Sequence, residues 1–373
     1  MSGGETGPTA EMANLISREI FEWFRWKRVD LLDQNFTCVK ASKHTGKEKT
    51  EHTHPVDVVF SYVDPYLNRR ILMNMDLKSY SASSISASPV RAALKSLAQT
   101  IDCARSSEEW DTRYNLEEGD SEIRGALFVY NHDAEYDKHF FDIFNPKRSG
   151  RLEHIERGIR TENLPLEPNM LLHVIDPLMI NYMTTIISDA NRLHREGSFP
   201  ETAYQFFYPE LRRHRVLVRS DEAPATIEQI AGPFLIIAHD TVTKYDEKKK
   251  ENVERHGPGY VIYYNRPGSS PIEFIYLFDC LATYQIPQTG QSLRIRVAHH
   301  QPHSDIRSHF KRAIESYLHD WGFDAAKREM LEAITLDILE IEKKTFSKVE
   351  LGWEKKESKW PSIALVIRQS STP

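Results

Sequence analysis

Apolar and polar positions change period along the first part of the chain, and each period predicts a different element. Residues 11–34 carry apolar side chains at the three-to-four spacing of an amphipathic helix. A short apolar run at 35–41 predicts a strand. Two further runs, 56–63 and 71–77, are joined by a turn-like segment that contains Pro65 and Asn68. This last pattern predicts a β-hairpin.

A second helix and a further strand follow the hairpin. Leu94, Leu97 and Ile101 form an apolar stripe within residues 90–105, and Pro89 suits the first turn of a helix. Residues 106–122 are acidic and predict a loop, and the apolar run 123–130 predicts a strand. The first 131 residues thus predict the order helix, strand, strand, strand, helix, strand.

The remaining two-thirds of the chain alternates in the same way. Strands are predicted at 170–175, 234–239, 260–264, 293–298 and 363–367. Helices are predicted at 177–197, 271–285, 305–320 and 324–344, with a charged loop at 244–257. Strands alternating with helices favour an α/β fold class.

The length of 373 residues exceeds that of a typical single core, so we expect two sections. We predict a disordered lead-in at 1–11, a first domain at 12–150 and an additional α/β section at 151–373. Hydrophobic residues make up 40% of the chain and charged residues 27%, as in soluble globular proteins. No apolar stretch approaches the roughly 20 residues of a membrane span, and the N-terminus lacks the features of a signal peptide. We therefore expect no membrane partner.

The three cysteines, Cys38, Cys103 and Cys280, lie far apart in the sequence and form no CxxC pair. We therefore expect neither a disulfide framework nor a cysteine-based zinc site, and we expect a cytoplasmic location. The basic segment 42–54 contains three histidines and is interpreted as a solvated hairpin tip, with contact to phosphates as the alternative. The basic cluster 212–215 is interpreted as a solvated face, with contact to nucleic acid or to a partner as the alternative.

The net charge of −6 argues against a chain that binds nucleic acid by its overall charge. The positive charge that binds the phosphates of a nucleic acid would then come from local basic patches or from a partner protein. His299, His300 and His303 resemble a metal cluster, but Pro302 indicates a turn and no zinc-type spacing accompanies them. No Walker A sequence is present.

The hairpin carries an unusual set of charges in an apolar setting. Asp57 lies in the first apolar run, and Asp76 and Lys78 share one face of the second because they are two residues apart. Two carboxylates suit Mg²⁺, which prefers oxygen ligands, and an ammonium group can stabilise charge on a phosphate. The alternative is a salt bridge on an edge strand, which stabilises a fold only slightly.

These residues and the predicted element order resemble the PD-(D/E)xK nuclease superfamily, which has a restriction-endonuclease-like αβββαβ core. Pro55-Val56-Asp57 stands for the PD motif with one residue inserted, and Asp76-Leu77-Lys78 stands for (D/E)xK. The resemblance covers residues 12–131. It implies a glutamate from the first helix, either Glu19 or Glu22 with a slight preference for Glu22, as a further catalytic residue and metal ligand.

The resemblance also implies a polar residue on the next helix, Lys95 or Gln99, and a Mg²⁺-dependent endonuclease acting on DNA, with Mn²⁺ as a substitute metal. In the family, such a domain with a large extra section belongs to bacterial anti-phage defence or repair and works with a partner protein. Two alternatives stay open. One is a catalytically inactive nuclease-fold subunit that binds nucleic acid or assists assembly, and the other is an RNase on the same core.

Overall fold

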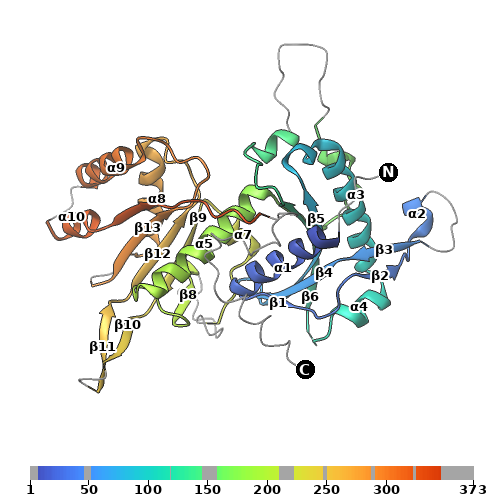
Figure 1. Cartoon of the computed structure of the whole chain (residues 1–373), viewed down its shortest axis with the longest axis horizontal. Helices are drawn as coiled ribbons and strands as arrows, with labels where there is room; N and C mark the ends of the chain where they lie inside the picture. The colour runs from blue at the N-terminus through green and yellow to red at the C-terminus, as the bar shows by residue number, and fades with distance from the viewer. Residues whose placement is uncertain are drawn as a thin grey trace, which may run out of the picture.

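Two five-stranded sheets lie side by side in the computed structural model, with helices packed against both (Figure 1). The structure describes residues 7–45, 52–117, 119–144, 158–209, 222–246, 250–286, 290–321 and 325–345. Its α-helices are α1 (Gly7–Trp23), α2 (Ala41–Thr45), α3 (Ala87–Ala104), α4 (Glu108–Tyr114), α5 (Pro177–Arg195), α7 (Ile227–Ile230), α8 (Pro271–Thr283), α9 (Ile306–Trp321) and α10 (Ala325–Glu332). Its strands are β1 (Lys27–Arg28), β2 (Gln34–Thr37), β3 (Thr53–Val56), β4 (Val58–Asp64), β5 (Arg69–Tyr80), β6 (Ser121–Asn131), β7 (Leu172–Ile175), β8 (Tyr204–Phe206), β9 (Phe234–His239), β10 (Val242–Asp246), β11 (Glu251–His256), β12 (Gly259–Tyr264), β13 (Ser292–Val297) and β14 (Thr335–Ile338).

The predicted hairpin is the centre of the first sheet, whose strand order is β1-β4-β5-β6-β7. Strands β4 and β5 are antiparallel, whereas β6 and β7 run parallel to β5. In the turn, the Asp64 carboxylate accepts hydrogen bonds from the backbone of Tyr66 and Leu67, and Asn68 takes a positive φ of 49°. The polar turn residues therefore close the hairpin locally, and this prediction is confirmed.

Side chains alternate strictly between the two faces of this sheet. On one face, Met73 and Met75 of β5 pack with Phe128 of β6 in the same core as α1 and α5. On the other face, Leu127 and Val129 of β6 pack against α3. Each face therefore has its own helical cover, and a side chain on β5 faces either α1 or α3.

The N-terminal elements differ from those expected. Residues 7–11 already belong to α1 rather than to a disordered lead-in, and residues 1–6 lie outside the described part. The helix predicted over 11–34 ends at Trp23, because the chain reverses through Arg25 with a φ of 66°. Residues 27–28 then form the edge strand β1 on β4. The strand predicted at 35–41 is β2, which pairs with β3 in a separate two-stranded sheet.

The first sheet extends past the boundary predicted at residue 150, because β7 pairs with β6. Gly125 of β6 allows this close packing. A Cβ at that position would lie 2.5 Å from Leu172 Cδ2 and 2.9 Å from Ile101 Cγ1. A boundary at 150 would thus remove the last strand of the sheet, and we place the end of the first section at about residue 176.

The second sheet has the order β14-β13-β12-β9-β8 and mixes parallel with antiparallel pairs. Helices α8 and α9 cover one face. Helix α5 packs against both sheets, since Ile186 and Met183 belong to one core with Phe128 of β6 and Val261 of β12. Residues 339–345 then return to the first sheet, where the Tyr130 hydroxyl donates to the Lys344 carbonyl at 2.9 Å. One of the hydrophobic cores is therefore shared by the two sheets.

Several predicted segments need correction. The predicted loop 106–122 contains α4, whose first turn is capped by the Ser107 hydroxyl. The charged segment 244–257 forms the hairpin β10–β11, and 324–344 contains α10, β14 and an extended segment rather than one helix. The strand predicted at 363–367 and the basic cluster 212–215 lie outside the described residues. Within the described residues, no helix combines the length and apolarity that crossing a membrane requires.

Candidate active site

Asp57, Asp76 and Lys78 come together on the α3 face of the first sheet. Val58 pairs with Met75 across the hairpin, which places Asp57 beside Asp76 on the adjoining positions. The Lys78 ammonium lies 2.5 Å from Asp76 Oδ1. The backbone N–H of Leu77 donates to Asp57 Oδ2 at 2.7 Å. The antiparallel register thus brings two carboxylates and an ammonium group to one point.

The electrostatics of this group indicate a shortage of positive charge. Burial and the neighbouring Asp76 carboxylate raise the pKa of Asp57 from 3.8 to about 7, against the opposing influence of Lys78 and the Leu77 N–H. One ammonium therefore does not balance the two acids. A divalent cation would do so, and carboxylate oxygens are the ligands that Mg²⁺ and Mn²⁺ prefer. The residues present fit such an ion.

Asp33 is an additional acidic residue of this region. Its backbone N–H donates to the Asp57 carbonyl at 3.1 Å, and its carboxylate contributes to the raised pKa of Asp57. Asp33 is exposed and has a positive φ of 51°. The sequence offered no signal for it, because it lies in a segment predicted to be helical.

Glu19 and Glu22 do not join this group. Both lie on α1, which packs against the opposite face of the sheet. Glu22 is exposed, and Glu19 lies near Lys344 of the returning segment. Burial raises the pKa of Glu19, which Lys344 and Arg18 partly offset. The expected helix glutamate is therefore separated from Asp57 and Asp76 by the sheet itself.

The two polar candidates on α3 have different surroundings. Lys95 is exposed. The Gln99 side-chain amide donates to the His44 carbonyl at 3.3 Å and so holds α2 against α3. Gln99 therefore has a structural contact that is independent of the carboxylates.

The histidines near residue 300 divide into two groups. The rings of His299 and His300 lie 4.4 Å apart, and burial lowers the pKa of His299 to about 4. His303 instead lies near Asp305 and His309. The Nδ1 atom of His303 accepts a hydrogen bond from the Asp305 backbone, which is an ordinary turn contact. The arrangement fits the turn expected from Pro302.

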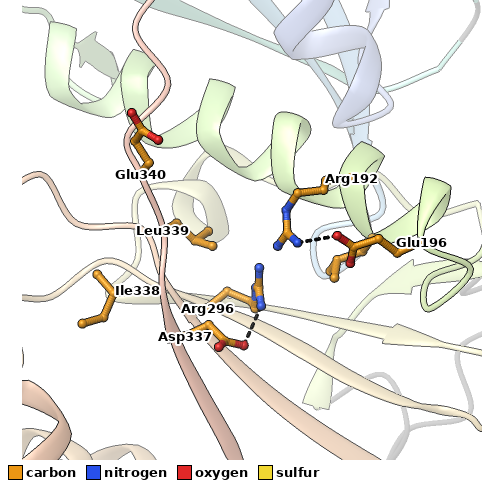
Figure 2. Close-up of a pocket in the computed structure, with 8 residues that line it drawn as sticks. Arg192, Glu196, Arg296, Asp337, Ile338, Leu339 and Glu340 are labelled. Atoms are coloured by element: carbon orange, nitrogen blue, oxygen red, sulfur yellow. Dashed lines mark hydrogen bonds and ion pairs between the residues drawn. The ribbon is translucent and has the colours of Figure 1, made fainter. Parts of the chain in front are cut away.

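A cleft of about 490 Å³ lies between α5 and the β13–β14 edge of the second sheet (Figure 2). It is lined by Arg192, Leu193, Glu196, Arg296, Asp337, Ile338, Leu339 and Glu340. Arg296 makes a two-bond contact with the buried Asp189 and a further ion pair with Asp337 at 2.6 Å. Arg192 pairs with Asp189 and with Glu196. The charged side chains at this cleft pair with one another, so we interpret them as a network of ion pairs that holds α5 against the second sheet.

Comparison with known proteins supports the nuclease interpretation of the hairpin. Residues 1–176 match the family described as "GAPS4 protein PD-(D/E)XK nuclease domain". The N-terminal section is a PD-(D/E)XK nuclease domain. Searches of curated proteins and of solved structures each found no match. The matched range ends one residue after β7, so it contains the first sheet with α1 to α4, whereas α5 follows it.

The resemblance noted from the sequence is thereby confirmed at the level of the superfamily, and the fold is a restriction-endonuclease-like core with a second α/β section. The core strands are β4, β5 and β6, with β1 and β7 at the edges. The match supports a nuclease, the class of hydrolase that cleaves phosphodiester bonds. The match does not extend to the second sheet.

Proposed function

We propose that this protein is a Mg²⁺-dependent endonuclease that hydrolyses phosphodiester bonds of DNA, with Asp57, Asp76 and Lys78 as its catalytic residues. The observation that supports this proposal best is the convergence of these three side chains within the PD-(D/E)XK domain. Asp57 and Asp76 are the proposed metal ligands. Mn²⁺ is the expected substitute metal.

Each residue has a distinct proposed role. The metal ion, when bound, supplies a Lewis acid for the phosphate and lowers the pKa of a bound water. Asp57 and Asp76 neutralise the ion, and the Leu77 N–H keeps the Asp57 carboxylate oriented. Lys78 is held at 2.5 Å from Asp76, where its ammonium can orient a water molecule or stabilise charge on the phosphate. We assign no catalytic role to Glu19 or Glu22, because α1 covers the other face of the sheet.

DNA as the substrate, a role in defence and a partner protein belong to the same proposal. The family that matches residues 1–176 is described as a nuclease domain, which supports a nucleic-acid substrate, and the defence role is carried over from the superfamily resemblance noted in the sequence. The net charge of −6 supports a partner that supplies part of the DNA-binding surface. Lys40 and Lys43 also pair with Asp102, so their charges are already partly compensated.

The direct test is a cleavage assay with supercoiled plasmid, linear DNA, single-stranded DNA and RNA, in Mg²⁺, Mn²⁺ or Ca²⁺. We expect nicking or linearisation of DNA in Mg²⁺ and Mn²⁺. Asp76→Asn and Lys78→Met should each reduce the rate by at least ~100-fold, as removal of charge stabilisation does at other active sites. Matched controls are Asp240→Asn and Lys311→Met, which alter exposed residues of the second section.

The outcomes separate the alternatives. Cleavage of RNA alone would replace DNA as the substrate but keep the active site. Full activity of both Asp76→Asn and Lys78→Met would refute the assigned site. If the wild-type protein cleaves no nucleic acid in either metal, alone and with proteins that copurify from its native host, the inactive subunit is the correct interpretation.

A further inference from the structure

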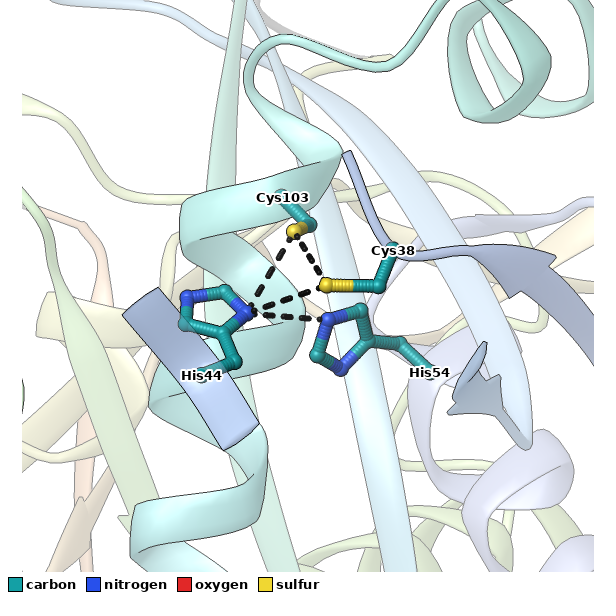
Figure 3. Close-up of side chains that lie close together, drawn as sticks. All are labelled: Cys38, His44, His54 and Cys103. Atoms are coloured by element: carbon teal, nitrogen blue, oxygen red, sulfur yellow. Dashed lines mark hydrogen bonds between the residues drawn. The ribbon is translucent and has the colours of Figure 1, made fainter. Parts of the chain in front are cut away.

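Four metal-binding side chains from distant parts of the sequence meet beneath the small β2–β3 hairpin. Cys38 follows β2, His44 lies on α2, His54 lies on β3 and Cys103 lies near the end of α3 (Figure 3). Cys38, His54 and Cys103 are buried, and the His44 side chain is only 2% exposed. Each offers one ligand atom, and these four atoms all lie within 4.8 Å of one another.

The separations between these atoms match the edges of a tetrahedral zinc site. With Zn–S bonds of ~2.3 Å and Zn–N bonds of ~2.05 Å, tetrahedral geometry gives about 3.8 Å for S···S, 3.6 Å for S···N and 3.3 Å for N···N. Here the Cys38 and Cys103 sulfurs are 3.6 Å apart. His44 Nδ1 lies 3.4 Å from the Cys38 sulfur, 3.5 Å from the Cys103 sulfur and 3.2 Å from His54 Nε2. All four measured edges agree within about 0.2 Å.

A carboxylate orients His44 for this role. His44 Nε2 lies 3.1 Å from Asp102 Oδ2, which leaves Nδ1 facing the two sulfurs and His54. A histidine that donates to a carboxylate while its other nitrogen binds metal is the usual outer contact of protein zinc sites. Lys40 and Lys43 also donate to Asp102 and fix its position.

Neither a disulfide nor apolar packing accounts for the cluster as well as a metal ion does. A disulfide needs sulfurs about 2.05 Å apart, whereas Cys38 and Cys103 are free thiols 3.6 Å apart. Simple packing in an apolar core would favour aliphatic side chains, not two imidazoles whose desolvation carries a cost.

We propose that Cys38, His44, His54 and Cys103 bind a structural Zn²⁺ ion that fastens the β2–β3 hairpin and α2 to α3. Four protein ligands leave no open position, which is typical of structural and not catalytic zinc. The proposal is independent of the nuclease activity. From the sequence alone we expected no cysteine-based zinc site and a solvated segment at 42–54. The structure reverses the interpretation of His44 and His54.

The position of the ion connects it to the carboxylates of the hairpin. His54 lies on β3, three residues before Asp57, and β3 leads directly into that residue. The ion would thus hold the start of β4 against α3, on the face where Asp57 and Asp76 lie. Zinc would stabilise this part of the domain without contacting the substrate.

The test is elemental analysis and X-ray absorption of the full chain, purified without chelator and freed of any affinity tag. We expect about one zinc ion per chain, and a fitted shell of two sulfurs at ~2.3 Å and two nitrogens at ~2.0–2.1 Å. Cys103→Ser should lower the zinc content to less than about a tenth of the wild-type value. Cys280→Ser is the matched control, and Asp57→Asn and Asp76→Asn should also retain zinc.

Several results would overturn the proposal. One is a zinc-free protein that takes up no zinc on dialysis against a stoichiometric amount, with all three thiols reactive. Another is a disulfide between Cys38 and Cys103 in the freshly purified chain. A shell of oxygen and nitrogen without sulfur would also exclude this site. Because the spectrum is measured on the wild-type protein, the conclusion does not depend on whether Cys103→Ser folds.

Discussion

Replacing Asp57 by Asn tests the electrostatic interpretation of the hairpin site directly. In the metal-free protein, burial and the Asp76 carboxylate raise the pKa of Asp57 from 3.8 to about 7. A difference of one pKa unit corresponds to ~1.4 kcal/mol, so ionising Asp57 in the folded protein costs about 4 kcal/mol relative to the unfolded chain. Asn has the same shape and can still accept from Leu77, but it carries no charge.

The sign of the effect follows from proton binding. Between about pH 4 and pH 7, the folded protein holds a proton on Asp57 that the unfolded chain has released. This contribution makes the wild-type protein less stable as pH rises through that window, and the loss is complete above pH 7. Asp57→Asn removes this pH-dependent destabilisation, because Asn does not ionise. The variant should therefore match the wild type near pH 4 and exceed it by up to about 4 kcal/mol at pH 8.

Thermal unfolding monitored by fluorescence from pH 4 to pH 8.5 measures this difference. For 373 residues unfolding together, about 4 kcal/mol corresponds to a rise in Tm on the order of 5 °C at pH 8. Mg²⁺ and Mn²⁺ should be removed with a resin and not with excess EDTA, so that tightly held zinc stays bound. Added Mg²⁺ should stabilise the wild type and have little effect on Asp57→Asn.

A constant Tm difference between the two proteins across this pH range would refute the reasoning, because a charge effect must appear with ionisation. Equal stabilisation of both by Mg²⁺ would also contradict the assignment of Asp57 as a ligand. Asp240→Asn, which changes an exposed aspartate, controls for general effects of the substitution.

Two further predictions concern the fold. Gly125→Ala should destabilise the protein by ~1–3 kcal/mol in urea unfolding, because the new Cβ would lie 2.5 Å from a Leu172 methyl group. An unchanged unfolding midpoint would contradict this prediction and would show that β7 can move away. Asp189→Asn should cost ~3–5 kcal/mol by the same measurement, because it leaves the buried Arg296 without its two-bond partner. Asp320→Asn, at an exposed position, should have almost no effect, and an equal loss in both Asp variants would rule out the lost Arg296 contact as the cause.

The hairpin was predictable from sequence because its signals are local. Two apolar runs joined by a turn-like segment predict the antiparallel hairpin, and the register that the structure shows, Val58 with Met75, brings Asp57 beside Asp76. The element order of the core follows from the same patterns. The edge strand β1 was not predictable, because the left-handed backbone at Arg25 ends α1 within a sequence whose periodicity continues.

Long-range geometry explains the remaining differences. An amphipathic period shows that α1 packs on a sheet but not which face it covers, so Glu19 and Glu22 could not be placed relative to Asp76. The Cys/His cluster contains Cys38 and Cys103, which are 65 positions apart in the sequence, so no short sequence motif predicts it. Strands β10 and β11 pair as a hairpin although they are polar, with mostly exposed side chains along β11. In such strands the pattern of apolar and polar residues does not show which side chains are buried, so the hairpin could not be predicted from it.

The continuous core shared by both sheets affects how this protein can change over evolution. Helix α5 contributes to the packing of the first and the second sheet at once, and the returning segment 339–345 binds β6 again. The nuclease domain is thus not a detachable module that could be exchanged between unrelated proteins without repacking. Substitutions on the two sides of α5 must compensate one another, so the second section should diverge together with the nuclease domain and be inherited with it as one unit.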